Sequence, residues 1–95
     1  MPQNTDIAVA ASAWTMITDA DVTSVTFQNK TSGAIYVKAT TDTTEPTNRD
    51  GAIVYNSGAG ERNVSMSDLF PGLSGADRLW VWASAKGEVF VSHAA

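Results

Sequence analysis

The sequence predicts an all-β protein, a small antiparallel β-sandwich or jelly-roll-like barrel of about eight short strands. Apolar residues recur at every second position through much of the chain, which is the period of a strand buried on one face. Clusters of Asn, Asp, Gly, Pro and Ser interrupt these runs at short intervals. The sequence contains no long amphipathic helix between them, so we expect the strands to pack on one another.

The alternating runs give the order of the predicted strands. They are residues 7–10, 13–18, 22–28, 34–40, 52–55, 61–65, 78–84 and 88–93. The turn-forming stretch 29–33 separates the third run from the fourth, which predicts an antiparallel hairpin.

Two segments between the strands have a different character. Residues 40–48 lack an aliphatic side chain and contain Pro46, so we expect an exposed loop. Residues 67–72 have a polar start and a Pro-Gly end, which predicts one helical turn. Leu69 and Phe70 would plug the core there.

The strongest hairpin signal lies near the carboxyl end, where residues 78–84 and 88–93 flank the turn 85–87. The first of these strands is apolar on both faces. Its alternate side chains are Leu79, Val81 and Ala83 on one side and Trp80 and Trp82 on the other. A strand exposed to water on one face would carry polar residues there, so something must cover the second face.

Two interpretations of the second, aromatic face compete. In the first, loops of the same chain cover the rings and complete an ordinary core. In the second, the face is a protein interface, because aromatic rings beside cations have the composition of a hot spot. Stacking of the rings on sugars is a third interpretation. The residues expected at the interface are Trp80, Trp82, Tyr36, Phe90, Arg78 and Lys38.

The length of the chain is that of one domain, which we expect to span residues 7–95. Residues 1–6 contain a Pro-Gln-Asn-Thr segment that cannot bury itself, and we expect a flexible arm that reaches a neighbouring protein. The arm residues expected to make that contact are Pro2, Gln3, Asn4 and Thr5.

Charge and composition exclude several classes of function. Six basic and ten acidic side chains give a net charge of -4, the wrong sign for nucleic acid or an anionic membrane surface. The sequence shows neither a secretory signal nor a run long enough to span a membrane. Because the chain has no cysteine, it has no disulfide, thiolate zinc site or cysteine nucleophile.

No motif in the sequence indicates an enzyme or a cofactor. His93 is the only histidine, and we expect it to be solvent-exposed or to have a packing role. No serine lies in a nucleophile elbow. Several acidic loop residues could offer oxygens to calcium, but no loop has EF-hand spacing, and we interpret them as turn formers without a metal. They are Asp19, Asp21, Asp42, Glu45 and Asp50.

Six segments that together span nearly the whole chain carry a family resemblance. They are residues 14–23, 26–29, 37–40, 60–64, 68–72 and 91–94. These segments resemble small proteins encoded in the structural modules of tailed phages and prophages. The resemblance implies a virion component that is not an enzyme. The commonest role among small all-β virion proteins is capsid decoration, in which the protein cements the exterior of the assembled head.

The resemblance also implies partners and a location. A decoration protein would bind the major capsid protein, and we expect a homo-oligomer, with a trimer favoured over a dimer. It would be made in the host bacterial cytoplasm and would lie on the capsid surface of the virion. The alternative is a receptor- or glycan-binding module of a phage tail or spike.

Overall fold

The computed structural model describes residues 2–19 and 21–94 and confirms the all-β prediction. The elements are β1 (Gln3–Val9), β2 (Trp14–Met16), β3 (Ser24–Asn29), β4 (Ile35–Thr40), β5 (Ile53–Tyr55), β6 (Gly60–Ser65), α1 (Met66–Leu69), β7 (Arg78–Ala83) and β8 (Gly87–His93). Met1, at the start of the predicted arm, lies outside the described residues, as do Ala20 and Ala95 of the predicted domain.

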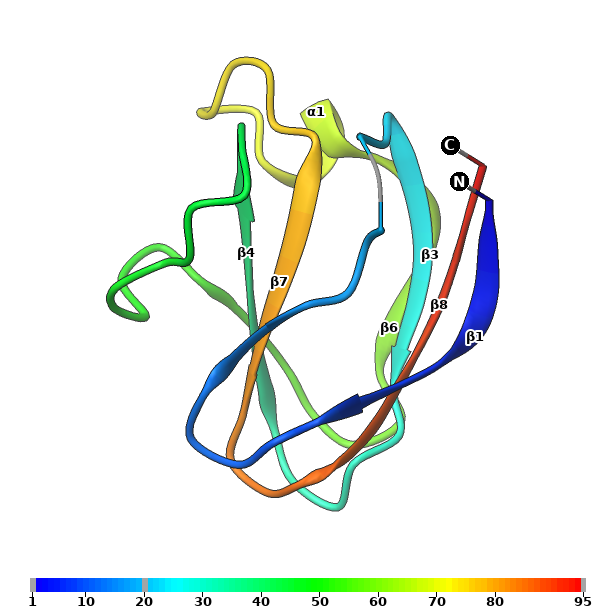
Figure 1. Ribbon diagram of the computed structural model, residues 1–95, viewed down its shortest axis with the longest axis vertical. Helices are drawn as coiled ribbons and strands as arrows, with labels where there is room; N and C mark the ends of the chain where they lie inside the picture. The colour runs from blue at the N-terminus through cyan, green and yellow to red at the C-terminus, as the bar shows by residue number, and fades with distance from the viewer. Residues whose placement is uncertain (1, 20, 95) are drawn as a thin grey trace.

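The strands form two four-stranded sheets that pack face to face (Figure 1). Sheet A has the order β1-β8-β3-β6, and sheet B has the order β2-β7-β4-β5. All pairings between neighbouring strands are antiparallel. The protein is therefore an antiparallel β-sandwich, as the sequence predicts.

The strand order follows a simple rule. β1 pairs with β8, β2 with β7, β3 with β6 and β4 with β5. The chain therefore resembles one long antiparallel ribbon that turns back between β4 and β5 and is then rolled up. Contacts of β8 with β3 and of β7 with β4 complete the two sheets. This winding is the jelly-roll arrangement.

Both predicted hairpins are wrong. β3 lies in sheet A and β4 in sheet B, and the same separation holds for β8 and β7. Each of these strands has an inward apolar face, and each short connection crosses from one sheet to the other. Side-chain alternation is the same in a hairpin and in such an arch, so the pattern could not distinguish them.

The arch between β3 and β4 is built around the buried side chain of Asn29. Its Nδ2 donates to the carbonyl oxygens of Gly33 at 2.8 Å and Tyr55 at 3.0 Å. Its Oδ1 accepts from the backbone N–H of Thr31 at 2.9 Å and from the Thr31 hydroxyl at 2.7 Å. These four bonds satisfy a buried amide and fix the path of the chain between the sheets.

The arch between β7 and β8 lies against the first one. The backbone N–H and the hydroxyl of Ser84 both donate to the carbonyl oxygen of Ala34, at 3.2 and 3.0 Å. A Cβ at Gly87 would lie 3.1 Å from the Cα of Thr31, and one at Gly33 would lie 2.5 Å from the Oγ of Ser84. The two arches approach so closely that a side chain at either glycine would require Ser84 or Thr31 to shift.

The core lies between the sheets and is filled from both. Fully buried side chains come from sheet A (Val25, Phe27, Val89 and Val91) and from sheet B (Ile35, Val37, Leu79 and Val81). Ser65 caps α1, its hydroxyl accepting the N–H of Asp68 at 3.0 Å. Leu69 and Phe70 pack against the core, which confirms the predicted plug.

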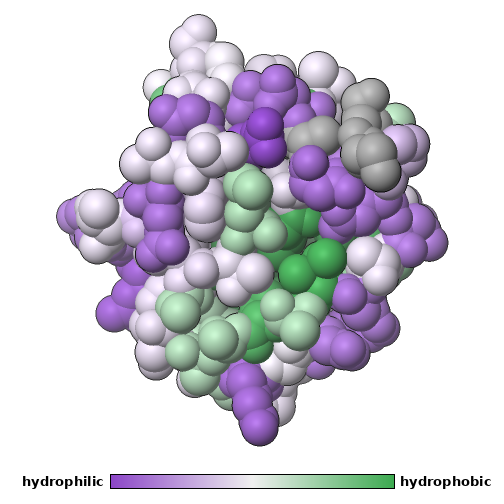
Figure 2. Space-filling view, in the orientation of Figure 1, coloured by the Kyte–Doolittle hydropathy of each residue, from purple (hydrophilic) through white to green (hydrophobic). Residues whose placement is uncertain are grey.

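Residues 10–19, which follow β1 and include β2, close one side of the sandwich (Figure 1). Ile17 within them is buried. Figure 2 shows this face: hydrophobic residues gather near its centre, and hydrophilic residues surround them.

The predicted arm differs from the structure at residues 3–6. Gln3 begins β1, which pairs with β8 from Gln3 opposite His93 to Val9 opposite Gly87. The Gln3 amide also donates to the carbonyl oxygen of Ile17 at 3.0 Å. Asn4 and Thr5 are exposed but lie in the strand, and Pro2 precedes it. Polar residues suit this edge strand because its outer side faces water, so their polarity does not indicate an arm.

Candidate functional site

The outward side of sheet B carries a row of large side chains in register. Trp14 of β2 lies opposite Trp82 of β7, Trp82 lies opposite Tyr36 of β4, and Tyr36 lies opposite Val54 of β5. The three rings are half-buried, and Val54 is 51% exposed. We call these four residues the outer row. It crosses the whole sheet, because its members come from all four strands.

The loop between β4 and β5 brings Arg49 onto this row. The Arg49 guanidinium carbon lies 4.2 Å from the ring centroid of Trp82 and 4.9 Å from that of Tyr36. The two rings are themselves in edge contact, with centroids 5.6 Å apart and planes at 82°. The two contacts of Arg49 with the rings are cation–π interactions, which hold the guanidinium at a defined place on the surface.

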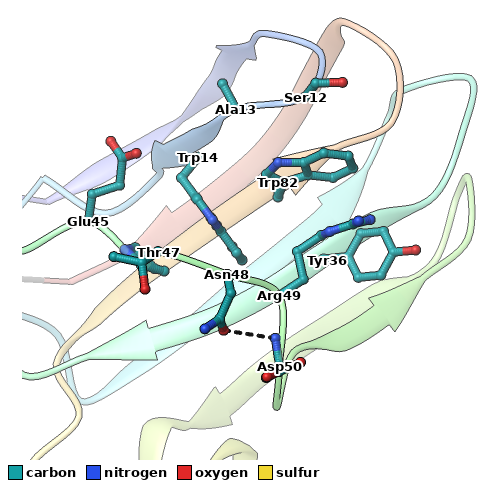
Figure 3. Close-up of a pocket in the computed structure, with 11 residues that line it drawn as sticks. Ser12, Ala13, Trp14, Tyr36, Glu45, Thr47, Asn48, Arg49, Asp50 and Trp82 are labelled. Carbon is teal, nitrogen blue, oxygen red and sulfur yellow. Dashed lines mark hydrogen bonds between the residues drawn. The ribbon is translucent and has the colours of Figure 1, made fainter.

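An open groove of about 1100 Å³ lies between the loop and the outer row (Figure 3). Trp14, Trp82 and Tyr36 supply its aromatic lining. The polar lining comes mainly from the loop residues Glu45, Thr47, Asn48, Arg49 and Asp50, and from Ser12 before β2. The groove therefore offers ring surfaces, hydrogen-bond donors and hydrogen-bond acceptors side by side, as ligand and partner sites do.

Hydrogen bonds within the loop, and one side chain of β4, shape the segment that lines the groove. Asn48 Oδ1 accepts the N–H of Asp50 at 3.0 Å, shown as the dashed line in Figure 3. Lys38 Nζ lies 3.4 Å from both Asn48 Oδ1 and the Asn48 carbonyl oxygen. Asp42 Oδ1 accepts the N–H of Thr44 at 2.8 Å. These local bonds shape the loop without using the guanidinium of Arg49.

The structure separates the residues that were expected to form one interface. Tyr36, Trp82 and Lys38 lie together on the outer face of sheet B. Trp80 lies on the same face but is only 7% exposed, and its Nε1 donates to the Thr40 hydroxyl at 2.9 Å. For Trp80 the structure favours the interpretation in which the chain covers its own ring.

Arg78 and Phe90 are further from the row. Arg78 lies at the start of β7, and its Nη2 makes an ion pair with Asp21 at 2.6 Å. Phe90 lies on β8 in the other sheet, where its neighbours across the strands are Asp6 and Gln28. It does not join the Trp and Tyr residues because outward positions on the two sheets face opposite ways.

His93 is buried, which agrees with the packing alternative and not with the solvent-exposed one. It is 6% exposed and lies opposite Gln3, and its Nε2 is 3.3 Å from Asp19 Oδ1. Within residues 2–19 and 21–94, no three His, Asp or Glu side chains gather as metal ligands would. Over the same residues, no helix has the length and apolar character needed to cross a bilayer.

Burial raises the pKa of the Tyr55 phenol well above its usual range, and the neighbouring Glu61 carboxylate raises it further. The hydroxyl donates to Glu61 Oε2 at 3.0 Å, and the ring packs edge-on against Phe27. Tyr55 lies outside the groove, so this pair belongs to the scaffold.

Sequence reasoning missed two central residues of the groove. Neither Arg49 nor Trp14 is among the residues that the sequence predicts at an interface, although Trp14 lies in the predicted strand 13–18. Trp14 shares its alternation phase with Met16, which places both on one face of a strand, but nothing in the pattern pairs β2 with β7. The loop position of Arg49 depends on a fold that brings residues 49 and 82 together.

Comparison of the chain with protein-family models, curated proteins and solved structures finds no match. The groove and the outer row are therefore interpreted from their own chemistry.

Proposed function

We propose that this protein is a non-enzymatic virion component, a capsid decoration protein that binds the assembled phage head through the outer face of sheet B. The resemblance to small phage structural proteins motivates the proposal. The observation that supports it best is the outer row with Arg49, because Trp, Tyr and Arg are the residues that most often dominate protein interfaces.

The two outer faces differ in a way that suits one-sided binding. Sheet A presents mainly polar side chains outward, among them Asn4, Asp6, Gln28 and Glu88. Sheet B presents half-buried rings. A shell protein would complete the burial of these rings, while the polar sheet would remain in water.

The proposed role is thermodynamic. A protein that binds the assembled head but not the free major capsid protein shifts the assembly equilibrium by mass action. Repeated sites on a symmetric shell suit a closed homo-oligomer, for which we propose a trimer on the capsid surface.

The test is cosedimentation of the purified protein with undecorated heads. Trp14→Ala and Trp82→Ala should each weaken binding by about 30-fold, the effect of a hot-spot residue worth about 2 kcal/mol. Phe90→Ala, on the opposite sheet, is the matched control and should bind like the wild type. Thermal unfolding of each variant would verify that it is folded. Failure of the wild-type protein to bind heads would refute the proposal.

A glycan-binding module of a tail or spike is the second candidate. The groove favours it, because Glu45, Asp50 and Asn48 beside Trp14 could bond sugar hydroxyls while the ring stacks on a sugar face. Host glycans immobilised on a surface would test this candidate directly. Retention by a glycan together with no retention by heads would select it over decoration.

A further inference from the structure

Arg49 is held by two rings but is not neutralised. Its guanidinium carbon is within 5 Å of the Trp82 and Tyr36 centroids, and those rings stand nearly perpendicular to each other. A guanidinium carries five N–H donors in a fixed planar fork. Cation–π contact with ring faces does not consume these donors, so the fork stays available to a ligand in the groove.

Two of the other cations have a carboxylate partner, whereas Lys38, Arg62 and Lys86 make no ion pair within the described residues. Lys30 pairs with Asp6 at 2.9 Å, and Arg78 pairs with Asp21. Within the described residues, Arg49 makes no ion pair, although Glu45 and Asp50 line the same groove. The loop therefore places the guanidinium of Arg49 in the same groove as Glu45 and Asp50 without an ion pair between them.

The two acidic residues restrict the kind of ligand that fits. An acidic run would be repelled by Glu45, by Asp50 and by the net charge of -4. A single carboxylate flanked by hydrogen-bond donors fits Arg49, Glu45 and Asp50 together. The guanidinium of Arg49 binds the carboxylate, and the two acidic side chains accept from the donors. Trp14 supplies an apolar wall on one side of such a contact.

We propose that the groove receives one Asp or Glu side chain from a loop of the partner protein and that Arg49 binds its carboxylate through both arms of the fork. This inference rests on the proposed function, since it names the chemistry of the contact with the shell. A lysine cannot reproduce the fork, so the arginine itself is required.

The first test measures binding to undecorated heads. Arg49→Gln should weaken binding by about tenfold or more, and Arg49→Lys should fall between this variant and the wild type because it keeps the charge alone. Arg62→Gln is the matched control, since Arg62 is exposed on β6 of the other sheet. If heads bind the wild type and Arg49→Gln equally, this inference is refuted while decoration stands.

The second test needs no partner. Acetylated glutamate methylamide is titrated into the protein, and the indole N–H signals of the three tryptophans are followed by NMR. A saturable shift is expected at Trp82 and Trp14, with none at Trp80, whose N–H is already bonded to Thr40. The shift should be absent in Arg49→Gln and absent with the glutamine analogue.

The two tests separate the possible failures. If no variant binds heads, the decoration proposal fails and the titration alone decides the role of Arg49. An equal shift with inorganic phosphate would show general anion attraction and would refute selectivity for a carboxylate. A neutral saccharide that binds the groove of wild type and Arg49→Gln alike would also overturn the inference.

Discussion

Asn29 shows how one side chain can direct the path of the chain between two sheets. Replacing it with Ala removes two donors and an acceptor from a site with no water access, where each unsatisfied group costs about 1–3 kcal/mol. We expect Asn29→Ala to lower the free energy of unfolding by about 3 kcal/mol or more. Urea denaturation would measure the loss.

Ser32→Ala is a suitable control for this measurement. Ser32 is exposed in the same arch, and surface changes of this kind alter stability by about 0.5 kcal/mol or less. Equal stability of Asn29→Ala and Ser32→Ala would show that the Asn29 bonds do not hold the arch.

Because of Tyr55, we expect the free energy of unfolding to fall at alkaline pH. Its pKa is raised in the folded protein, so the unfolded chain releases the phenolic proton first as the pH rises. The contribution is fully present below the unfolded pKa of about 10 and declines above it, by at most about 1.4 kcal/mol per pH unit.

The measurement is urea unfolding between pH 8 and pH 11 for the wild type and Tyr55→Phe. The variant should lose about 1 kcal/mol at pH 8, because the bond to Glu61 is gone. Its stability should then fall less steeply above pH 10 than that of the wild type. Parallel pH profiles would contradict a buried neutral phenol.

At the scale of elements, the contact between the two arches leaves little space for a side chain at Gly87. A methyl group there would meet three atoms of Thr31 at 3.1–3.2 Å, and two of these belong to a packed side chain. We expect Gly87→Ala to destabilise the protein by about 1–3 kcal/mol, as overpacking does. Thermal unfolding would measure the effect.

Gly72→Ala is the matched control for this substitution. A Cβ at Gly72 would meet nothing within 4 Å, and its φ lies outside the left-handed region. Ala there should be neutral or stabilise by about 0.4–1 kcal/mol through the unfolded chain. If both substitutions had the same effect, the arch contact would not be the cause.

Strand positions were predictable from the sequence, but strand partners were not. The runs at 34–40 and 78–84 coincide with β4 and β7 to within one residue at each end, because alternation is a local property. The turn after β3 is an arch in the structure, and there Asn29 bonds the carbonyl oxygen of Tyr55, 26 residues away. No local pattern contains that information.

The candidate site was predictable only in part, for the same reason. Tyr36 and Trp82 could be recognised as a face that needs covering, since the alternate side of each strand is already apolar. Phe90 has the same local pattern but lies on the other sheet. Arg49 reaches the rings through a long loop, and its position depends on pairing between distant strands.

At the scale of the molecule, β1 is part of the sandwich and should be needed for its stability. Deleting residues 2–6 removes the first four of the seven residue pairs that join β1 to β8, and also the bond from Gln3 to Ile17. We expect the midpoint of thermal unfolding to fall by about 5 °C or more, the shift that about 1 kcal/mol causes in a domain of this size.

Asp6→Asn separates pairing from charge in this experiment. It removes the exposed ion pair with Lys30 and keeps the strand, so it should change stability by less than about 1 kcal/mol. An unchanged midpoint after the deletion would mean that residues 2–6 behave as a free arm after all.

The rolled ribbon also has a consequence for biosynthesis. β8 is inserted between β1 and β3 in sheet A, so β1 has no neighbour in that sheet until β8 has left the ribosome. Earlier in translation β1 is unpaired, and its Ile7 and Val9 are uncovered. The first antiparallel pair between strands that are consecutive in the sequence is β4 with β5. Folding should therefore begin at the middle of the chain and close last where the earliest and latest residues meet.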